Sequence, residues 1–177
     1  MTKKIICYAD ILGFSTKFQS LSTIEKREVY LSLITKVEDA CHWQKCYSDT
    51  PKFNSKRCDF YWFSDAFILF SEDDYFMSSN NAIIETRLST FFHSVKMLFL
   101  HFLSMGFPLR GGIDYGEFIG EPEKNIFLGE ALINAVKMSD KHKWSGISLT
   151  PGFSDFIRPY NLWNGSLIAF PPAWFRD

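Results

Sequence analysis

The chain has 177 residues, the length of one ordinary domain, and 46% of them are hydrophobic, which excludes a disordered protein. With 19 Lys and Arg against 20 Asp and Glu, the formal net charge is −1, so the basic excess that a general nucleic-acid binder needs is absent. A small anionic substrate is not excluded, because a local site needs only a few donors or a metal.

We expect neither export nor insertion into a membrane. No run of about 18 apolar residues occurs, and the N-terminal apolar run is too short for the core of a signal peptide. The cysteines lack dense spacing, so we expect reduced thiols in a cytoplasmic protein. They are Cys7, Cys41, Cys46 and Cys58. A metal site at Cys41, His42 and Cys46 would lack a fourth ligand, and ordinary half-buried thiols are favoured.

The N-terminal part predicts a strand followed by a helix. Residues 4–9 are apolar and rich in β-branched and aromatic side chains, which is typical of a buried strand, and the run ends at Asp10. Ser22 and Glu25 have the spacing of a capping box, and the apolar periodicity after them predicts a helix that ends at about Cys41.

The next segment predicts a loop and a hairpin. Residues 44–57 are polar and contain a proline, which favours a loop. Residues 60–63 and 66–70 are almost wholly apolar and flank Ser64 and Asp65. This pattern predicts two strands joined by a tight turn at those two residues.

The C-terminal half predicts two helices and three strands. Residues 80–105 have helical apolar spacing, and the second half of this segment is apolar on nearly all sides, which suggests burial on two sides. Residues 108–114 predict a strand, and 116–120 predict a turn and the next strand of a hairpin. Residues 129–141 predict a helix, and 146–149 a further strand.

The order of these elements predicts an α+β fold. Its first part, β, α, β, β, α, β, matches a ferredoxin-like unit, an antiparallel sheet with helices on one face, and an extra hairpin follows. The sequence shows no internal repeat or linker, so we expect one domain over residues 1–177. We assign no structure to the aromatic, proline-containing tail at 153–177.

Two isolated acids mark a candidate site. Asp10 ends the first strand, Asp65 lies in the hairpin turn, and the predicted fold makes those strands neighbours. Two adjacent carboxylates repel unless a cation lies between them, and divalent cations held by Asp oxygens and substrate phosphates are one solution. The alternative is that Asp10 caps the next helix and Asp65 is a turn residue; spacing leaves both open. Gly13, followed by the amides of Phe14 and Ser15, could cradle a phosphate.

Four motifs carry a resemblance to a known family. Residues 8–15 (Tyr-Ala-Asp-Ile-Leu-Gly-Phe-Ser) resemble the opening motif of class III nucleotide cyclases, and 63–67 (Phe-Ser-Asp-Ala-Phe) resemble their second metal motif. Residues 110–117 are similar to their Arg–x–Gly–Ile–His–x–Gly strand, and 129–137 to the start of their late helix. Each motif is weak alone, but the four follow the family order across residues 8–149.

Details of these motifs resemble one subfamily. Ser64 replaces the usual glycine, Gly111 and Gly112 form a doubled glycine, and residues 143–147 read Lys-Trp-Ser-Gly-Ile. These features look like the pyrimidine cyclases of the bacterial Pycsar antiphage system, which are small, lone cyclase domains. The resemblance implies conversion of UTP to 3′,5′-cyclic UMP and pyrophosphate in antiviral defence, with the product acting on a separate effector protein. Alternatives are a cytidylate cyclase making cyclic CMP, a purine cyclase, or a catalytically silent nucleotide-binding module.

The resemblance also assigns roles at the site. Asp10, Asp65 and the carbonyl of Ile11 would bind two divalent cations, Mn²⁺ or Mg²⁺. The β- and γ-phosphates would lie on the amides of Gly13, Phe14 and Ser15. Class III sites form between two domains, so a lone domain implies a head-to-tail homodimer with two sites. The implied partners are a pyrimidine nucleoside triphosphate and a second copy, with no nucleic acid and no membrane.

Base selection and transition-state stabilisation fall on other residues. Tyr61 stands where adenylate cyclases have a base-reading Lys; a bulky phenol favours the smaller pyrimidine, or Tyr61 is simply a core aromatic. The family's late Asn and Arg align with Ile133 and Lys137, and Asn134 lies one place on. Either Lys137 or Arg110 is therefore a candidate for stabilising the transition state.

Overall fold

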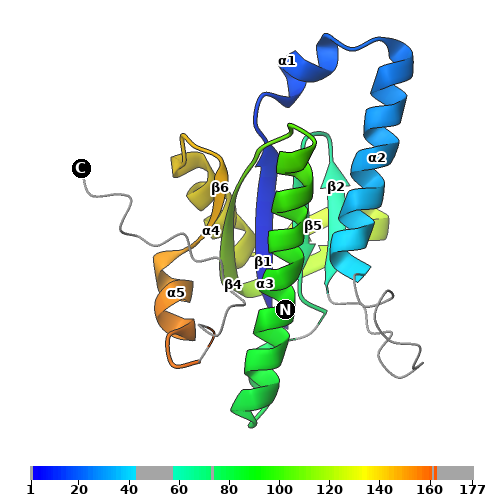
Figure 1. Ribbon diagram of the computed structural model, residues 1–177. Helices are drawn as coiled ribbons and strands as arrows, with labels where there is room; N and C mark the ends of the chain where they lie inside the picture. Colours follow the sequence, from blue (N-terminus) through cyan, green and yellow to red (C-terminus); the bar gives the residue numbers. More distant parts are fainter. Residues whose placement is uncertain (1, 43–57, 73, 161, 163–177) are drawn as a thin grey trace.

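The computed structural model describes residues 2–42, 58–72, 74–160 and 162 (Figure 1). The predicted loop at 44–57, with Cys46, and most of the tail at 153–177 lie outside the described residues. The strands are β1 (Thr2–Ile11), β2 (Asp59–Phe63), β3 (Ala66–Phe70), β4 (Leu109–Glu121), β5 (Ile126–Leu128) and β6 (Gly146–Leu149). The helices are α1 (Phe14–Gln19), α2 (Thr23–His42), α3 (Asn81–Ser104), α4 (Glu130–Lys141) and α5 (Pro151–Ile157), with short 3-10 turns η3 (Tyr75–Met77) and η4 (Pro122–Lys124).

The strands form one mixed sheet that is mainly antiparallel. Its order is β2-β3-β1-β4-β5, with β6 parallel to β4. The predicted pairing of the first strand with the hairpin is confirmed: β1 runs antiparallel to β3, with Asp10 opposite Ala66. The protein is thus a mixed α/β fold, and the ferredoxin-like description of its core stays a prediction.

The sheet is curled, so that strands at opposite ends of the order meet. β2 and β5 are separated by three strands in the order. Nevertheless, the rings of Tyr61 on β2 and Phe127 on β5 lie 4.3 Å apart between centroids. Figure 1 shows β5 passing behind β2. Residues distant in the strand order can therefore share one site.

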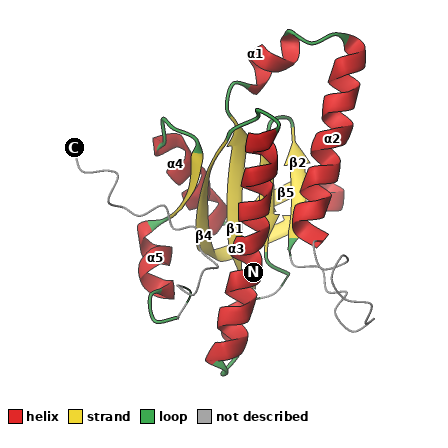
Figure 2. Ribbon diagram, viewed as in Figure 1, coloured by secondary structure: helices red, strands yellow, loops and turns green. Residues whose placement is uncertain are grey.

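Helices cover both faces of the sheet, with α2 and α3 on one face and α4 on the other (Figure 2). Successive side chains of a strand point to opposite faces. Accordingly, Ile5 and Cys7 join the main core with α3, whereas Ile6 packs with Ala131 of α4. The same alternation places Asp10 on the α4 face.

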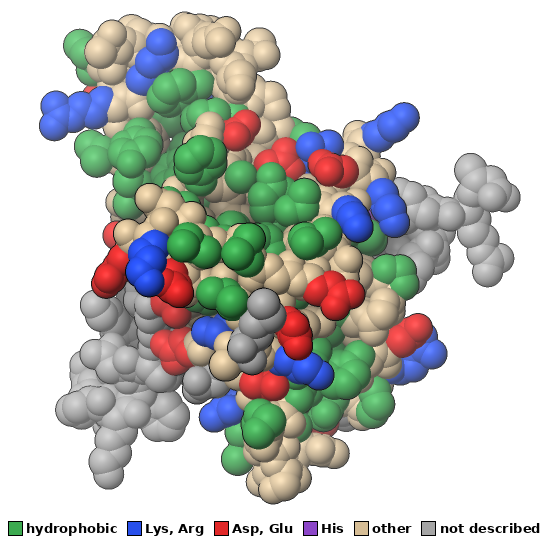
Figure 3. Space-filling model, turned by 180° about the vertical axis from the view of Figure 1, so that it is seen from behind, with side chains coloured by type: hydrophobic (Ala, Val, Ile, Leu, Met, Phe, Trp, Pro, Cys, Tyr) green, Lys and Arg blue, Asp and Glu red, His purple; other side chains and the backbone are tan. Residues whose placement is uncertain are grey.

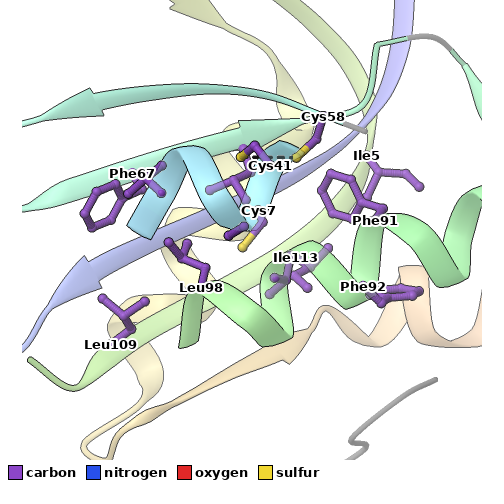
Figure 4. Close-up of a cluster of buried hydrophobic side chains, with 14 of the residues drawn as sticks. Ile5, Cys7, Cys41, Cys58, Phe67, Phe91, Phe92, Leu98, Leu109 and Ile113 are labelled. Carbon is purple, nitrogen blue, oxygen red and sulfur yellow. Dashed lines mark hydrogen bonds between the residues drawn. The ribbon is translucent and has the colours of Figure 1, made fainter. Parts of the chain in front are cut away.

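The main core is built from aliphatic, aromatic and thiol side chains (Figure 4). Cys7, Cys41 and Cys58 are buried there, and the thiol of Cys58 donates to Sγ of Cys41 over 3.5 Å. On α3, the burial expected on two sides is incomplete, because Leu100 and Leu103 are 39% and 46% exposed. Within the described residues, no helix has both the length and the apolar character to cross a membrane.

One predicted boundary was wrong. β4 runs unbroken through Gly116, so 116–120 contains no turn. The hairpin turns later, at η4 and Asn125, where Pro122 opens the turn and Asn125 takes the left-handed conformation that closes it, with φ 55°. The strand predicted at 146–149 is confirmed as β6. Pro151 begins α5, and the hydroxyl of Thr150 accepts the amide of Phe153 and caps that helix.

Candidate functional site

The two candidate carboxylates come from the same end of two paired strands. β1 and β3 pair as far as Asp10 and Ala66, and the amide of Ile11 donates to the carbonyl oxygen of Asp65 over 2.8 Å. The turn between β2 and β3 is tight, because Ser64 adopts a φ of 57°. The alternative in which Asp10 caps the following helix is wrong, since Gly13 is the N-cap of α1 and no side chain caps it.

The carboxylate of Asp10 is held by two neighbours. Arg110 on β4 donates from Nε to Oδ1 over 3.2 Å and from Nη2 to Oδ2 over 3.1 Å. Ser139 on α4 donates its hydroxyl to Oδ1 over 2.9 Å. Arg110 also donates from Nη1 to the carbonyl oxygen of His142 over 3.2 Å. The ion pair is partly buried, with the side chains of Arg110 and Asp10 26% and 17% exposed.

Negative charge is concentrated around this pair. Burial raises the pKa of Tyr8, and the charges of Asp10, Asp140 and Asp65 raise it further, while Arg110 opposes them. Such a field favours a cation. Within the described part of the chain, no group of three or more His, Cys, Asp or Glu side chains could hold a metal. A cation here would therefore take its remaining ligands from the backbone, water or substrate.

α1 begins immediately beyond β1. Gly13 adopts a φ of 68°, and Phe14 starts the helix. The first amides of a helix have no partner within it and can bind an acceptor from outside. Lys17 fixes the helix against the corner between α3 and β4, because its Nζ donates to the carbonyl oxygen of Gly106 over 2.7 Å and lies 4.0 Å from the centroid of the Phe107 ring.

The candidates on α4 differ in their surroundings. The side chain of Ile133 is 54% exposed, and Lys137 is exposed. Asn134 faces the sheet, where its amide donates to Oδ2 of Asp114 over 2.9 Å. Asp114 also accepts the hydroxyl of Thr150. Asn134 is therefore part of a hydrogen-bond network that connects α4, β4 and the start of α5.

Tyr61 is not a simple core aromatic. Its ring packs on Phe127, but its hydroxyl donates to Oδ1 of Asn125 at the exposed hairpin turn. The ring is only partly buried.

Four residues around the candidate side chains were not predicted from the sequence: Ser139, Asp140 and His142 near Asp10 and Arg110, and Asn125 at Tyr61. The doubled glycine was the available signal for the first three. A Cβ at Gly112 would lie 2.3 Å from the carbonyl oxygen of Ala135, so only glycine lets α4 approach β4 this closely. That approach brings Ser139 to Asp10.

No family model matches the sequence, and no curated protein matches it. Among solved structures, the catalytic core of a rhodopsin-guanylyl cyclase with converted specificity, in complex with ATPαS, superposes with a TM-score of 0.58 at 12% identity, over 89% of this chain and 82% of that one. A bacterial light-regulated adenylyl cyclase gives 0.50 at 16% identity, over 88% and 79%. These structures are class III cyclase catalytic domains, and the similarity shows a shared fold.

Proposed function

We propose that this chain is a single-domain nucleotide cyclase that converts UTP to 3′,5′-cyclic UMP and pyrophosphate. The observation that carries the proposal is the position of Asp10 and Asp65, side by side at one end of paired strands in a cyclase-like fold. We further propose that the protein works in the cytoplasm and that its product is a second messenger, which activates a separate effector in antiviral defence.

The carboxylates fit divalent cations. Asp10, Asp65 and the carbonyl of Ile11 would hold two ions, Mn²⁺ or Mg²⁺, which when bound lower the pKa of the attacking 3′-hydroxyl and neutralise charge on the leaving pyrophosphate. The charges of Asp10, Asp140 and Asp65, which add to the effect of burial in raising the pKa of Tyr8, support this assignment. Arg110 supplies the positive charge at Asp10 in the structure, and a bound cation would take over that role.

The remaining residues position the substrate. Attack of the 3′-hydroxyl on the α-phosphate is intramolecular, so orientation is most of the catalytic task. The amides of Gly13, Phe14 and Ser15 would bind the β- and γ-phosphates at the start of α1. Arg110 or Lys137 would stabilise the charge of the transition state.

The site is proposed to be completed by a second copy in a head-to-tail homodimer. Exposed apolar side chains lie on β5 and α4, where Ile126, Leu128 and Ile133 are 38%, 60% and 54% exposed. Figure 3 shows the molecule from behind, the side on which α4 and β5 lie in Figure 1. Hydrophobic side chains are gathered on this face. Such a patch is typical of an interaction surface.

Substitution of the carboxylates tests the proposal. Purified protein is incubated with UTP and Mn²⁺, and the nucleotide products are identified by mass spectrometry. Asp10→Asn and Asp65→Asn should each abolish cyclic UMP, whereas Asp39→Asn, at an exposed position on α2, should retain it. Near-normal product from either site variant would contradict the assignment. Binding of UTP without turnover by the unaltered protein would favour the silent module.

A further inference from the structure

Ser139 is a buried serine on α4 that contacts a proposed metal ligand. Its side chain has no exposed surface, and its hydroxyl donates to Oδ1 of Asp10 over 2.9 Å. An ionised carboxylate only accepts hydrogen bonds, so the direction of this bond is fixed. A helical serine can instead donate to the carbonyl oxygen four residues earlier, as Ser94 of α3 does to Thr90. The hydroxyl of Ser139 therefore serves a contact between α4 and β1.

The packing of α4 on the sheet keeps this contact in place. A Cβ at Gly112 of β4 would lie 2.3 Å from the carbonyl oxygen of Ala135 and 2.7 Å from Cβ of Met138, so the helix lies directly against the strand. Ala135 and Ser139 are both buried and are four positions apart, on one face of α4. The short side chain of Ser139 thus reaches Asp10 from a closely packed helix.

The two residues that donate to Asp10 differ in charge. The guanidinium of Arg110 is positive, so a divalent cation on the same carboxylate would repel it. Arg110 also donates to the carbonyl oxygen of His142 over 3.2 Å, a contact that does not depend on Asp10. The hydroxyl of Ser139 is neutral, and a carboxylate has about four lone-pair sites, so this hydroxyl can stay on Oδ1 beside a bound cation.

We infer that Ser139 is the positioning residue of Asp10 and keeps its carboxylate in one orientation when a cation replaces Arg110. The inference rests on the proposed function, in which Asp10 is a ligand of the divalent cations. Partners that orient a metal ligand without touching the metal typically change metal affinity by about tenfold to a hundredfold. Arg110 and Ser139 should therefore have opposite effects on cation binding, although both donate to the same carboxylate.

Ser139→Ala is the decisive variant. Alanine removes only the hydroxyl and favours a helix, and Arg110 still holds Asp10 in the cation-free protein. We therefore expect little change in the melting temperature without metal. The Kd for Mn²⁺, measured without nucleotide by electron paramagnetic resonance of the free ion, should rise by about tenfold to a hundredfold. Arg110→Met should lower the same Kd.

Two comparisons separate orientation of the ligand from general destabilisation. Ser94→Ala removes a hydroxyl from another buried helical serine, which donates to Thr90 and not to Asp10, so the Kd for Mn²⁺ should stay unchanged. In the cyclase assay, Ser139→Ala should need more Mn²⁺ for half-maximal activity by the same factor as its Kd rises. At saturating Mn²⁺, its kcat and its KM for UTP should stay close to those of the unaltered protein. A merely structural role would lower the melting temperature and leave the metal dependence unchanged.

Each outcome decides the inference. A Kd for Mn²⁺ that is unchanged or lower in Ser139→Ala overturns it, while the cyclase proposal stands. If the unaltered protein binds Mn²⁺ through Asp10 but cyclises no nucleotide, the cyclase proposal fails and the change in Kd still decides the inference. Should Ser139→Ala not fold, Ser139→Cys replaces it, and the weaker thiol donor should raise the Kd less. An unaltered protein that binds no Mn²⁺, or whose binding survives Asp10→Asn, refutes both the metal site and the inference.

Discussion

Replacement of Arg110 by methionine should weaken the fold and make its stability depend on divalent cations. The change removes two charge-assisted hydrogen bonds to Asp10 and leaves only Ser139 on that carboxylate. Loss of one partner from a buried ion pair costs about 3–5 kcal/mol. The Asp10 side chain is 17% exposed and keeps some hydration, so we expect about 2–3 kcal/mol here. For a domain of this size, that loss lowers the melting temperature by roughly 5–10 °C.

The cation response provides the sharper measurement. A ligand that binds only the folded state stabilises it in proportion to the logarithm of its concentration over Kd. Urea unfolding with and without Mn²⁺ should show a larger stabilisation for Arg110→Met than for the unaltered protein, because no guanidinium competes for Asp10. Asp10→Asn should lose the response. An Arg110→Met variant that gains no more from Mn²⁺ than the unaltered protein would refute the view that Arg110 stands in for a cation.

Three further results are expected. Gly112→Ala should cost about 1–3 kcal/mol in urea unfolding, because its Cβ would meet the carbonyl oxygen of Ala135, whereas Gly152→Ala, with open space around it, should be neutral or slightly stabilising. Burial lowers the pKa of His142, and the charge of Arg110 lowers it further. The folded state therefore favours the neutral imidazole, whose contribution to stability is complete above about pH 6.5 and is lost as the pH falls. His142→Gln should accordingly lose less stability than the unaltered protein between about pH 7.5 and about pH 5.5; an equal loss would show that His142 does not titrate on unfolding. Sedimentation at concentrations that give full specific activity should show a dimer, and a monomer there would contradict the proposed assembly.

Local patterns predicted the elements that carry the two carboxylates. The apolar run before Asp10 and the two apolar runs around Ser64 and Asp65 have the strand lengths and turn chemistry that fix a register. The capping box correctly predicted the start of α2, which begins at Thr23. As expected, the carboxylate of Glu25 accepts the amide of Ser22 over 2.8 Å.

Contacts between distant segments could not be predicted in this way. Ser139 reaches Asp10 across 129 positions, and Asn125 reaches Tyr61 across 64. The first depends on how closely α4 packs on β4, and the second on the curl of the sheet. Gly116 misled the sequence argument because a glycine within a strand and a glycine in a turn look alike locally.

The most direct test of the central claim is a competition between substrates. An equimolar mixture of UTP, CTP, ATP and GTP is incubated with the protein and Mn²⁺, and the cyclic nucleotides are quantified by mass spectrometry. We expect cyclic UMP as the dominant product, with none formed by Asp10→Asn or Asp65→Asn. Cyclic AMP formed as readily as cyclic UMP, or no cyclic nucleotide from any substrate, would contradict it.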